Sequence, residues 1–280
     1  MAMDAHHYDL HTHSTYSDGV LRPAEVVARA ATAGVTCLAL SDHDEIRGLR
    51  EAQEHARGNG IKFIAGVEIS VSWETQTLHV LGLCIDPDNG ELQAGLAAIR
   101  AGRHQRAHRI AQGLERTGVV GSLQGARSLA FNPELVSRTH FARYLVEQGH
   151  ARDLNAAFRR FLGTGAPGHV SHQWATLGDT LRWITGSGGL SVLAHPARYK
   201  LDPAQREKLL ASFCDLGGTG IEVVSGNHNP EQVAAWGRYA ARFGLLASAG
   251  SDFHGPVAGR NDLGKLPQLP AGCVPVWSRF

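Results

Sequence analysis

Histidine and carboxylate side chains gather at the ends of short apolar segments along this 280-residue chain. The chain holds 16 histidines, which form neither a tag nor a continuous tract. Imidazole nitrogens and carboxylate oxygens bind divalent metal ions, so metal chemistry is the first explanation to consider. Nine side chains are candidate ligands: His11, His13, Asp18, His43, Glu68, His79, His195, Asp252 and His254.

The spacing of these candidates favours a shared site. His11 and His13 occur as His-x-His, and a strand turns both imidazoles to the same side because its side chains alternate. Other candidates follow apolar segments in the motifs SDHD, GVEIS, LAHP and SDFH, whereas His79 opens its segment. A catalytic metal takes three or four protein ligands, so nine predict two or three ions, with Glu68 as a candidate bridge. Nitrogen and oxygen ligands without thiolate suit Mn²⁺, Fe²⁺ or Zn²⁺.

The elements that must position these residues alternate between strand and helix. Helical segments separate most of the strands, which predicts parallel strands with helices outside. The carboxyl ends of barrel strands meet on one face, where active sites lie, and the length suits a TIM-like barrel with one insertion. Seven strands are expected, at residues 8–11, 36–41, 61–68, 78–85, 190–194, 220–224 and 245–249.

A helical, arginine-rich insertion is expected at residues 91–179, between barrel segments 1–90 and 180–280. From Gly95 to Leu162 there are 11 arginines and four acidic residues, a net of +7. The rest of the chain carries 16 basic and 22 acidic residues, a net of −6. The overall net charge of +1 therefore combines a basic insertion with an acidic barrel.

Four arginines of the insertion recur every three residues, as one row on a helix: Arg100, Arg103, Arg106 and Arg109. A solvated helix face and attraction of an anionic substrate both explain such a row, and the row alone does not decide between them.

Composition excludes several classes of protein. With 43% hydrophobic and 19% charged residues, the chain is neither disordered nor fibrous. No apolar run approaches the ~18 residues of a membrane span, and the N-terminus lacks the features of a signal peptide. The four cysteines fit neither a zinc motif nor a dense disulfide framework, so a cytoplasmic location is expected.

The segments LHTHSTYSDG, LSDHD, GVEIS, LHVLG, LAHP and GSDFHG resemble the polymerase-and-histidinol-phosphatase (PHP) family of metal-dependent phosphoesterases. They extend from residue 8 to residue 255, so the resemblance covers nearly the whole chain. It implies a distorted (β/α)₇ barrel with a trinuclear site. Some members have His where this chain has Asp18, and the harder oxygen ligand favours Mn²⁺. Three ligand sets are implied by motif: His11, His13, Glu68 and Asp252; Glu68, His79 and His195; and Asp18, His43 and His254.

The insertion segment SRTHFARYLVEQG resembles one branch of this family, which includes nucleoside 3′,5′-bisphosphate phosphatases and 5′→3′ exoribonucleases acting on short RNA. The resemblance implies that Arg138 and His140 bind phosphate, for which the fork of a guanidinium is well suited. Surface or structural roles are the alternatives for the further substrate-binding candidates, which are Arg22, Arg198, Asn227 and His228.

Asp42 and Asp44 flank His43. We expect them to accept hydrogen bonds from metal-bound imidazoles, as such imidazoles usually require. One of them could instead transfer a proton. The candidate catalytic residues are therefore Asp42 and Asp44, together with His140 of the insertion.

The resulting hypothesis is hydrolysis of a phosphomonoester. Clustered metals lower the pKa of a bound water to give hydroxide and stabilise the leaving oxygen. The preferred substrate is a nucleoside 3′,5′-bisphosphate, which would lose its 3′-phosphate and leave the 5′-monophosphate while the insertion grips the other phosphate. The alternatives are a 5′→3′ exoribonuclease on short oligonucleotides, a histidinol phosphatase, and a non-enzymatic metal-binding scaffold or regulatory PHP domain. Neither long duplex nucleic acid nor a membrane is an expected partner.

Overall fold

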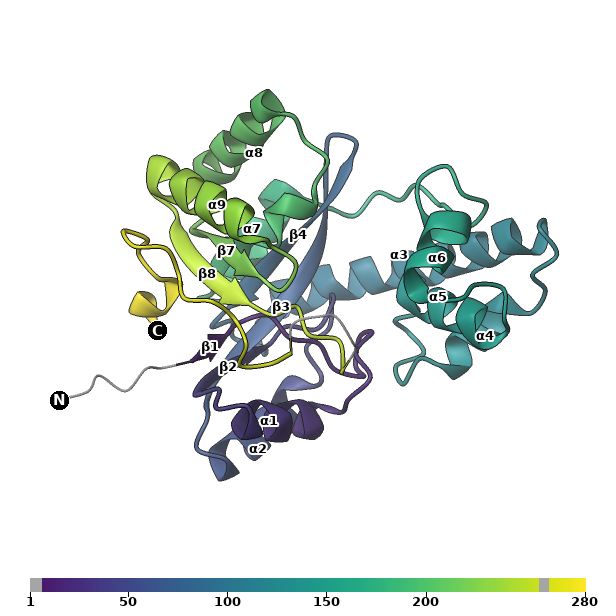
Figure 1. Cartoon of the computed structure of the whole chain (residues 1–280), viewed down its shortest axis with the longest axis horizontal. Coiled ribbons are helices and arrows are strands. Elements are labelled where there is room, and N and C mark those ends of the chain that lie inside the picture. Colours follow the sequence, from purple (N-terminus) through teal and green to yellow (C-terminus); the bar gives the residue numbers. More distant parts are fainter. Residues whose placement is uncertain (1–6, 257–261) are drawn as a thin grey trace.

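A computed structural model describes residues 7–256 and 262–280, and residues 1–6 and 257–261 lie outside the described part. Its main sheet runs β1-β2-β3-β4-β6-β7-β8, and β5 (Ala175–Thr176) pairs with β3 beside this path. The two edges of the sheet meet, since Leu10 N donates to Ala249 O at 3.0 Å. The strands are β1 (Tyr8–Asp9), β2 (Cys37–Leu40), β3 (Lys62–Trp73), β4 (Gln76–Leu83), β6 (Leu190–Leu193), β7 (Gly220–Ser225) and β8 (Leu246–Gly250). The expected α/β barrel is confirmed (Figure 1).

Strand β4 differs from the expected parallel arrangement. It runs antiparallel to both of its neighbours, β3 and β6. A tight turn containing Glu74 (φ 50°) joins β3 to β4 without a helix, so the chain must run back along the sheet. The beginning of β4, with His79, therefore lies at the same barrel face as the carboxyl ends of the other strands. This direction explains why His79 lies in the first half of β4 and does not follow the end of its strand, as most of the other candidates do.

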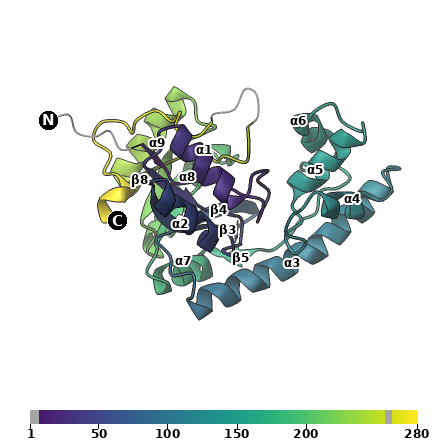
Figure 2. The same ribbon diagram turned by 90° about the horizontal axis from the view of Figure 1, so that it is seen from below.

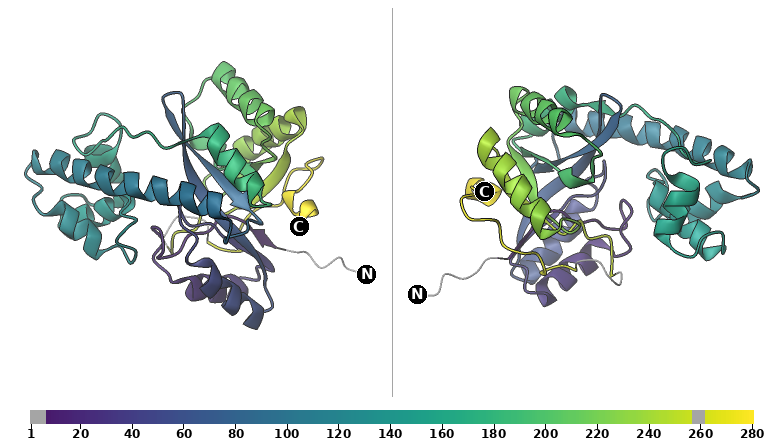
Figure 3. Two further views of the ribbon diagram at one scale, coloured as in Figure 1. Left: turned by 180° about the vertical axis from the view of Figure 1, so that it is seen from behind. Right: turned by 45° about the horizontal axis from the view of Figure 1, so that its top comes forward.

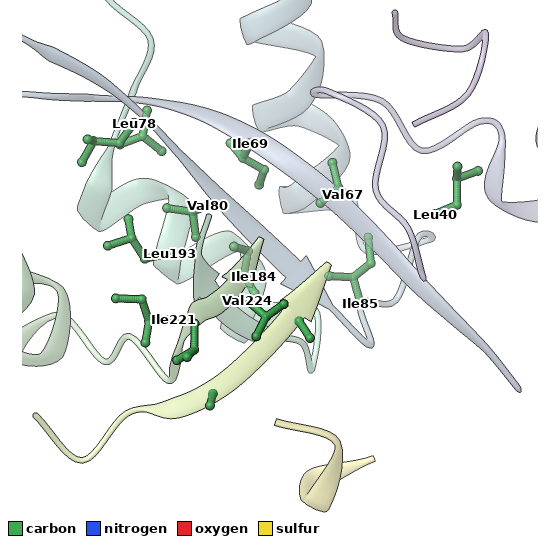
Figure 4. Packing of buried hydrophobic residues seen from close by; sticks show 14 of the residues in the cluster. Leu40, Val67, Ile69, Leu78, Val80, Ile85, Ile184, Leu193, Ile221 and Val224 are labelled. Carbon is green, nitrogen blue, oxygen red and sulfur yellow. The ribbon is translucent and has the colours of Figure 1, made fainter. Parts of the chain in front are cut away.

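Side chains alternate across the barrel wall, as strand geometry requires. Residues on one side of each strand pack against the outer helices, as Val67, Ile69, Leu78, Val80 and Ile221 do (Figure 4). A smaller cluster fills the inside and includes Leu10, Ala39, Ile64, Leu81 and Val192. Glu68 stands between Val67 and Ile69, so it points inward. Glu222 does the same in β7.

Helices surround the barrel on its outside (Figure 1). They bury the outward apolar side chains and leave the carboxyl-terminal face open to the insertion. They are α1 (Pro23–Thr32), α2 (Leu49–Gly58), α7 (Leu177–Gly186), α8 (Pro203–Asp215) and α9 (Pro230–Phe243).

Helix α3 (Gly90–Glu115) connects the barrel to the helical insertion (Figures 2 and 3). Its first half belongs to the barrel core through Leu92, Leu96 and Ile99. From Ala107 onward it joins a separate hydrophobic cluster. The other helices of that cluster are α4 (Ser122–Ser128), α5 (Arg138–Glu147), α6 (Leu154–Ala157) and the π-helix η1 (Phe158–Leu162). We refer to residues 107–162 as the cap, and we propose that the domain boundary lies within α3 and not at residue 91.

No helix in the part of the chain that the structure describes is long and apolar enough to cross a bilayer. The four cysteines, all of which lie in that part, are free.

Candidate metal centre and anion pocket

The nine candidate metal ligands lie together at the carboxyl-terminal face of the barrel. Three groups of them offer ligand atoms that all lie within 4.8 Å of one another. The groups are His11, His13, Glu68 and Asp252; His43, Glu68 and His79; and His13, Asp18, His43 and His254. The first group is identical to the set implied by the motifs. The second group has His43 where the implied set has His195. The third group contains the implied set of Asp18, His43 and His254 and adds His13.

His195 nevertheless contacts the same carboxylate as the second group. Its Nε2 lies 2.8 Å from Glu68 Oε1, and His79 Nδ1 lies 2.8 Å from the same oxygen. The other oxygen, Oε2, lies 3.3 Å from His11 Nε2 and 2.8 Å from His43 Nδ1. The two oxygens of Glu68 thus face different imidazoles, an arrangement that suits a bridging ligand.

Buried ligand atoms without hydrogen bonds show that these residues fit metal ions. Such atoms within residues 7–256 and 262–280 include His11 Nε2, His13 Nε2, Asp18 Oδ1, His43 Nδ1 and Glu68 Oε2. Each buried polar atom left unsatisfied costs about 1–3 kcal/mol. Five of them converge in one place. His43 Nδ1 and Glu68 Oε2 are 2.8 Å apart but do not have the angles of a hydrogen bond, and divalent ions would satisfy all five atoms.

Charges at the site are strongly coupled. Burial lowers the pKa of His11, but the carboxylates of Glu222, Glu68 and Asp252 outweigh it and raise this pKa well above its usual value. Burial likewise opposes protonation of His43, yet Glu68 and other acidic neighbours raise its pKa to about 9. Protons on these imidazoles therefore compete with metal ions for the same nitrogen atoms.

Glu222 is a site residue that sequence reasoning missed. It is fully buried, its Oε1 accepts from His11 Nδ1 at 2.8 Å, and its Oε2 accepts from the backbone N of His195 at 2.5 Å. With a proton on Nδ1, His11 keeps the lone pair of Nε2 for a metal, so Glu222 orients a candidate ligand. A signal was present, because Glu222 is the only charged residue of the apolar strand GIEVVS.

Asp42 does not bond an imidazole within the described part of the chain, contrary to expectation. It accepts from Ser14 N at 2.7 Å, from Ser14 Oγ at 2.6 Å and from Ser17 Oγ at 2.5 Å. It reaches His13 only through Ser17 Oγ, which lies 3.4 Å from His13 Nδ1. Asp42 therefore holds the loop that follows β1.

Asp44 also differs from its predicted role. Its carboxylate accepts from Ser70 N at 2.7 Å and from Ser70 Oγ at 3.0 Å, and it forms a buried ion pair with Arg103. Asp44 has φ of 51°, so these bonds hold a backbone conformation that is unfavourable for a residue with a side chain. Its carboxylate anchors the loop of His43 and orients no imidazole among the described residues.

A pocket of about 800 Å³ lies between the metal-ligand groups and the insertion. Metal-ligand candidates, cations and aromatic rings all face it. Its lining includes Asp18, His43, His79, Arg103, Arg106, Arg138, Phe158, Trp174, Arg198 and Lys200. The volume is within the range of small-ligand pockets, about 300–1,000 Å³.

Two of the pocket arginines have no carboxylate partner among the residues that the structure describes. Arg106 contacts Val170 O at 3.4 Å and lies over the Trp174 ring at 5.3 Å, while Arg138 lies over the Phe158 ring at 5.9 Å. Burial, and then neighbouring guanidinium charges, lower the pKa of both, that of Arg106 to about 9. An anion in the pocket would relieve this repulsion.

Three other substrate-binding candidates lie near one another. Arg198 lines the pocket, but it pairs with Asp252 Oδ2 at 2.5 Å. With its amide oxygen turned toward Arg198, Asn227 accepts from Arg198 Nη2 at 2.5 Å. His228 Nδ1 bonds Val223 O at 3.0 Å, and neither Asn227 nor His228 is among the described residues that line the pocket.

Arg22 and His140 are not brought into the pocket lining of the described structure. Arg22 is the N-cap residue of α1, its side chain is 57% exposed, and its Nη2 lies 3.4 Å from Glu51 Oε2. His140 is 1% exposed and accepts from Ser137 N at 3.0 Å in the capping box of α5. Burial lowers the pKa of His140 to about 4, so the ring is neutral.

The fold and the site define a barrel protein whose carboxyl-terminal face carries a cluster of candidate metal ligands. The PHP domain family matches residues 9–154. A 3′,5′-nucleoside bisphosphate phosphatase of Chromobacterium violaceum is 48% identical over 96% of this chain and 94% of its own. A 5′-3′ exoribonuclease of Haemophilus influenzae is 41% identical over 98% of both chains. A solved structure from Chromobacterium violaceum, described as an amidohydrolase with bound sulfate and no metal, covers 97% of this chain and 94% of its own, with 48% identity and a TM-score of 0.94. The chain belongs to the PHP family, as its motifs indicated.

Proposed function

We propose that this protein is a metal-dependent phosphomonoesterase that removes the 3′-phosphate of nucleoside 3′,5′-bisphosphates and releases the 5′-monophosphate. The observation that carries the proposal is the composition of one pocket. Candidate metal ligands and the unpaired cations of Arg106 and Arg138 line the same pocket. A substrate with two phosphates complements both groups. The similarity to a 3′,5′-nucleoside bisphosphate phosphatase supports this substrate class.

The nine candidates would hold two or three divalent ions, with Mn²⁺ preferred because Asp18, Glu68 and Asp252 supply oxygen ligands. Such ions activate water and neutralise the charge of the phosphoryl group. Glu68 bridges the ligand groups, and Glu222 keeps the Nε2 lone pair of His11 available. Arg198 offsets the negative charge of Asp252.

The second phosphate is assigned to Arg106 and Arg138. Both arginines are half-buried, and burial is the main cause that lowers their pKa values. Hydrogen bonds to a charged group contribute about 1.5–3 kcal/mol each, more than bonds between neutral groups. Fixing this phosphate would place the 3′-phosphate at the metal ligands.

The test measures phosphate release from adenosine 3′,5′-bisphosphate and from p-nitrophenyl phosphate, with Mn²⁺ supplied. Replacement of Arg138 by Met should lower kcat/KM for the bisphosphate by about 10–150-fold, the equivalent of one such bond, and leave the aryl phosphate unaffected. Arg22→Met is the matched control, since Arg22 lies outside the pocket lining. Equal losses on both substrates, or a wild type no better on the bisphosphate than on the aryl phosphate, would exclude this assignment.

A second candidate is 5′→3′ exonucleolytic cleavage of short oligoribonucleotides. The volume of the pocket, about 800 Å³, and the aromatic rings of Phe158 and Trp174 favour it, because bases stack on aromatic side chains. The similar exoribonuclease of Haemophilus influenzae supports it as well. A ladder of 5′-phosphorylated oligonucleotides of two to ten residues tests it. Hydrolysis of the mononucleotide bisphosphate without cleavage of any oligonucleotide in the ladder would rule it out.

A further inference from the structure

Three side chains of the cap hold the short loop that carries Asp18. Asn132 Nδ2 donates to Tyr16 O at 3.1 Å, and Arg143 Nη2 donates to Asp18 O at 2.5 Å. Ser137 Oγ donates to Asp18 Oδ2 at 3.2 Å. The loop belongs to the barrel, whereas all three donors lie in the cap, so these bonds cross from one part of the molecule to the other.

The carboxylate of Asp18 is divided between two environments. Its Oδ1 makes no hydrogen bond and lies 3.2 Å from His254 Nε2 and 3.8 Å from His43 Nε2, in one of the three ligand groups. Its Oδ2 accepts the hydrogen bond from Ser137. The side chain of Asp18 is only 4% exposed, so water contributes little to fixing it.

Ser137 has a hydroxyl hydrogen available for Asp18. Its oxygen accepts from Thr139 N at 3.1 Å as the N-cap of α5. His140 Nδ1 lies 3.3 Å from this oxygen, but it already accepts from the backbone N of Ser137 at the shorter distance of 3.0 Å and has one lone pair. The hydroxyl can therefore donate to the carboxylate, which makes this a charge-assisted bond in a buried place.

We propose that Ser137 and Arg143 are positioning residues for the metal group of Asp18, so that metal binding there and docking of the cap on the barrel are coupled. A carboxylate that is held from the cap side keeps Oδ1 directed at the imidazoles. By thermodynamic linkage, a metal that fixes Asp18 also strengthens the attachment of the cap. This inference rests on the metal centre of the proposed function.

The experiment measures two quantities for the full chain: Mn²⁺ bound at equilibrium, by dialysis and metal analysis, and amide hydrogen exchange in α5. Ser137→Ala should weaken one class of Mn²⁺ sites about 10-fold and leave the others unchanged. Mn²⁺ should slow exchange in α5 of the wild type and have little effect on α5 of this variant. Ser137→Thr keeps a hydroxyl and should restore both properties.

Asp153→Ala is the matched control. Asp153 is the N-cap of α6 and accepts from Ala156 N at 2.7 Å, so its replacement also removes a helix cap without touching the loop of Asp18. The coupling is overturned if Ser137→Ala binds Mn²⁺ like the wild type, or if Asp153→Ala weakens it equally. A wild type that binds no Mn²⁺ would overturn the proposed metal centre as well. Failure of the coupling alone would leave Mn²⁺-dependent phosphate release by the wild type intact.

Discussion

Replacement of Glu222 by Gln isolates the contribution of a residue that contacts the candidate ligand His11 only at Nδ1, the ring nitrogen on the side away from the ligand group. Glu222 accepts two hydrogen bonds, one from His11 Nδ1 and one from the backbone N of His195. Gln has the same shape but only one acceptor oxygen. It therefore cannot satisfy both donors in this fully buried position.

Both orientations of the new amide have a cost. If its oxygen faces His195 N, its NH₂ group faces His11, whose neutral ring must then accept at Nδ1 and carry its proton on Nε2. That proton blocks the nitrogen that points into the ligand group. If the amide is reversed, its NH₂ group meets the backbone N–H of His195, and an unsatisfied buried donor costs about 1–3 kcal/mol. At 1.4 kcal/mol for each factor of ten, we expect Mn²⁺ affinity to fall by about 10–100-fold.

Titration calorimetry with Mn²⁺ at one pH measures this change, and thermal unfolding in the presence of chelator shows whether the variant remains folded. Glu207→Gln is the control, because Glu207 pairs with Arg242 on the surface at 2.7 Å. Unchanged Mn²⁺ affinity in a folded Glu222→Gln variant would refute the proposed orienting role.

Further outcomes follow from the same contacts. The pKa of His43 is raised to about 9, so Mn²⁺ must displace a proton from this imidazole, and Mn²⁺ affinity should increase from about pH 6.5 to pH 9. Calorimetry in buffers of different ionisation enthalpy measures the protons released, and binding without proton release would contradict this prediction. For the same reason His43 contributes stability to the metal-free fold that is lost between about pH 6.5 and pH 9, and chemical denaturation of the wild type and a His43→Asn variant over this range can check it. Gly250→Ala would bring a new Cβ into a clash with His11 Cβ, so both the melting temperature and Mn²⁺ affinity should fall. An unchanged melting curve would show that the strand relaxes. Arg103→Met leaves the carboxylate of Asp44 buried and unpaired, so urea unfolding should show a loss of about 3–5 kcal/mol, and a loss under 1 kcal/mol would argue against the ion pair.

Much of the barrel could be predicted because its strands are apolar, short and separated by helices. The segments expected at 36–41 and 220–224 correspond to β2 (Cys37–Leu40) and β7 (Gly220–Ser225). The antiparallel direction of β4 was not predicted, since hydrophobic periodicity reports which residues are buried and not which way a strand runs.

The candidate ligands were found because polar residues after apolar strands must meet at one barrel face. The residues that orient them are harder to find from sequence. Glu222 lies 211 positions from His11 in the sequence, and the two residues meet only because both side chains point into the barrel interior. Asp42 and Asp44 stand beside a ligand in sequence, yet alternation along the chain turns their carboxylates toward serines and Arg103. Adjacency in sequence therefore predicted the wrong orienting partners.

The arginine row of α3 shows why counting charge alone does not identify a substrate site. Steps of three residues rotate about 300° around a helix, so such a row drifts by about 60° at each step. Accordingly, Arg100 donates to Asp44 O at 2.8 Å, Arg103 pairs with the Asp44 carboxylate, Arg106 faces the pocket, and Arg109 is exposed. Two members of the row thus stabilise the barrel loop, and one remains for an anion.

The charge available to a substrate is therefore much smaller than the net of +7 on the insertion suggests. It consists chiefly of Arg106 and Arg138, which neighbouring guanidinium groups repel and which form no ion pair with a carboxylate of the described residues, although Asp18 attracts Arg138. A monophosphate bound at the metal ligands leaves this repulsion in place, whereas a second phosphate removes it. Selectivity for doubly phosphorylated substrates should then depend on the cap cations and weaken as salt rises, while hydrolysis of a simple aryl phosphate should depend on salt much less.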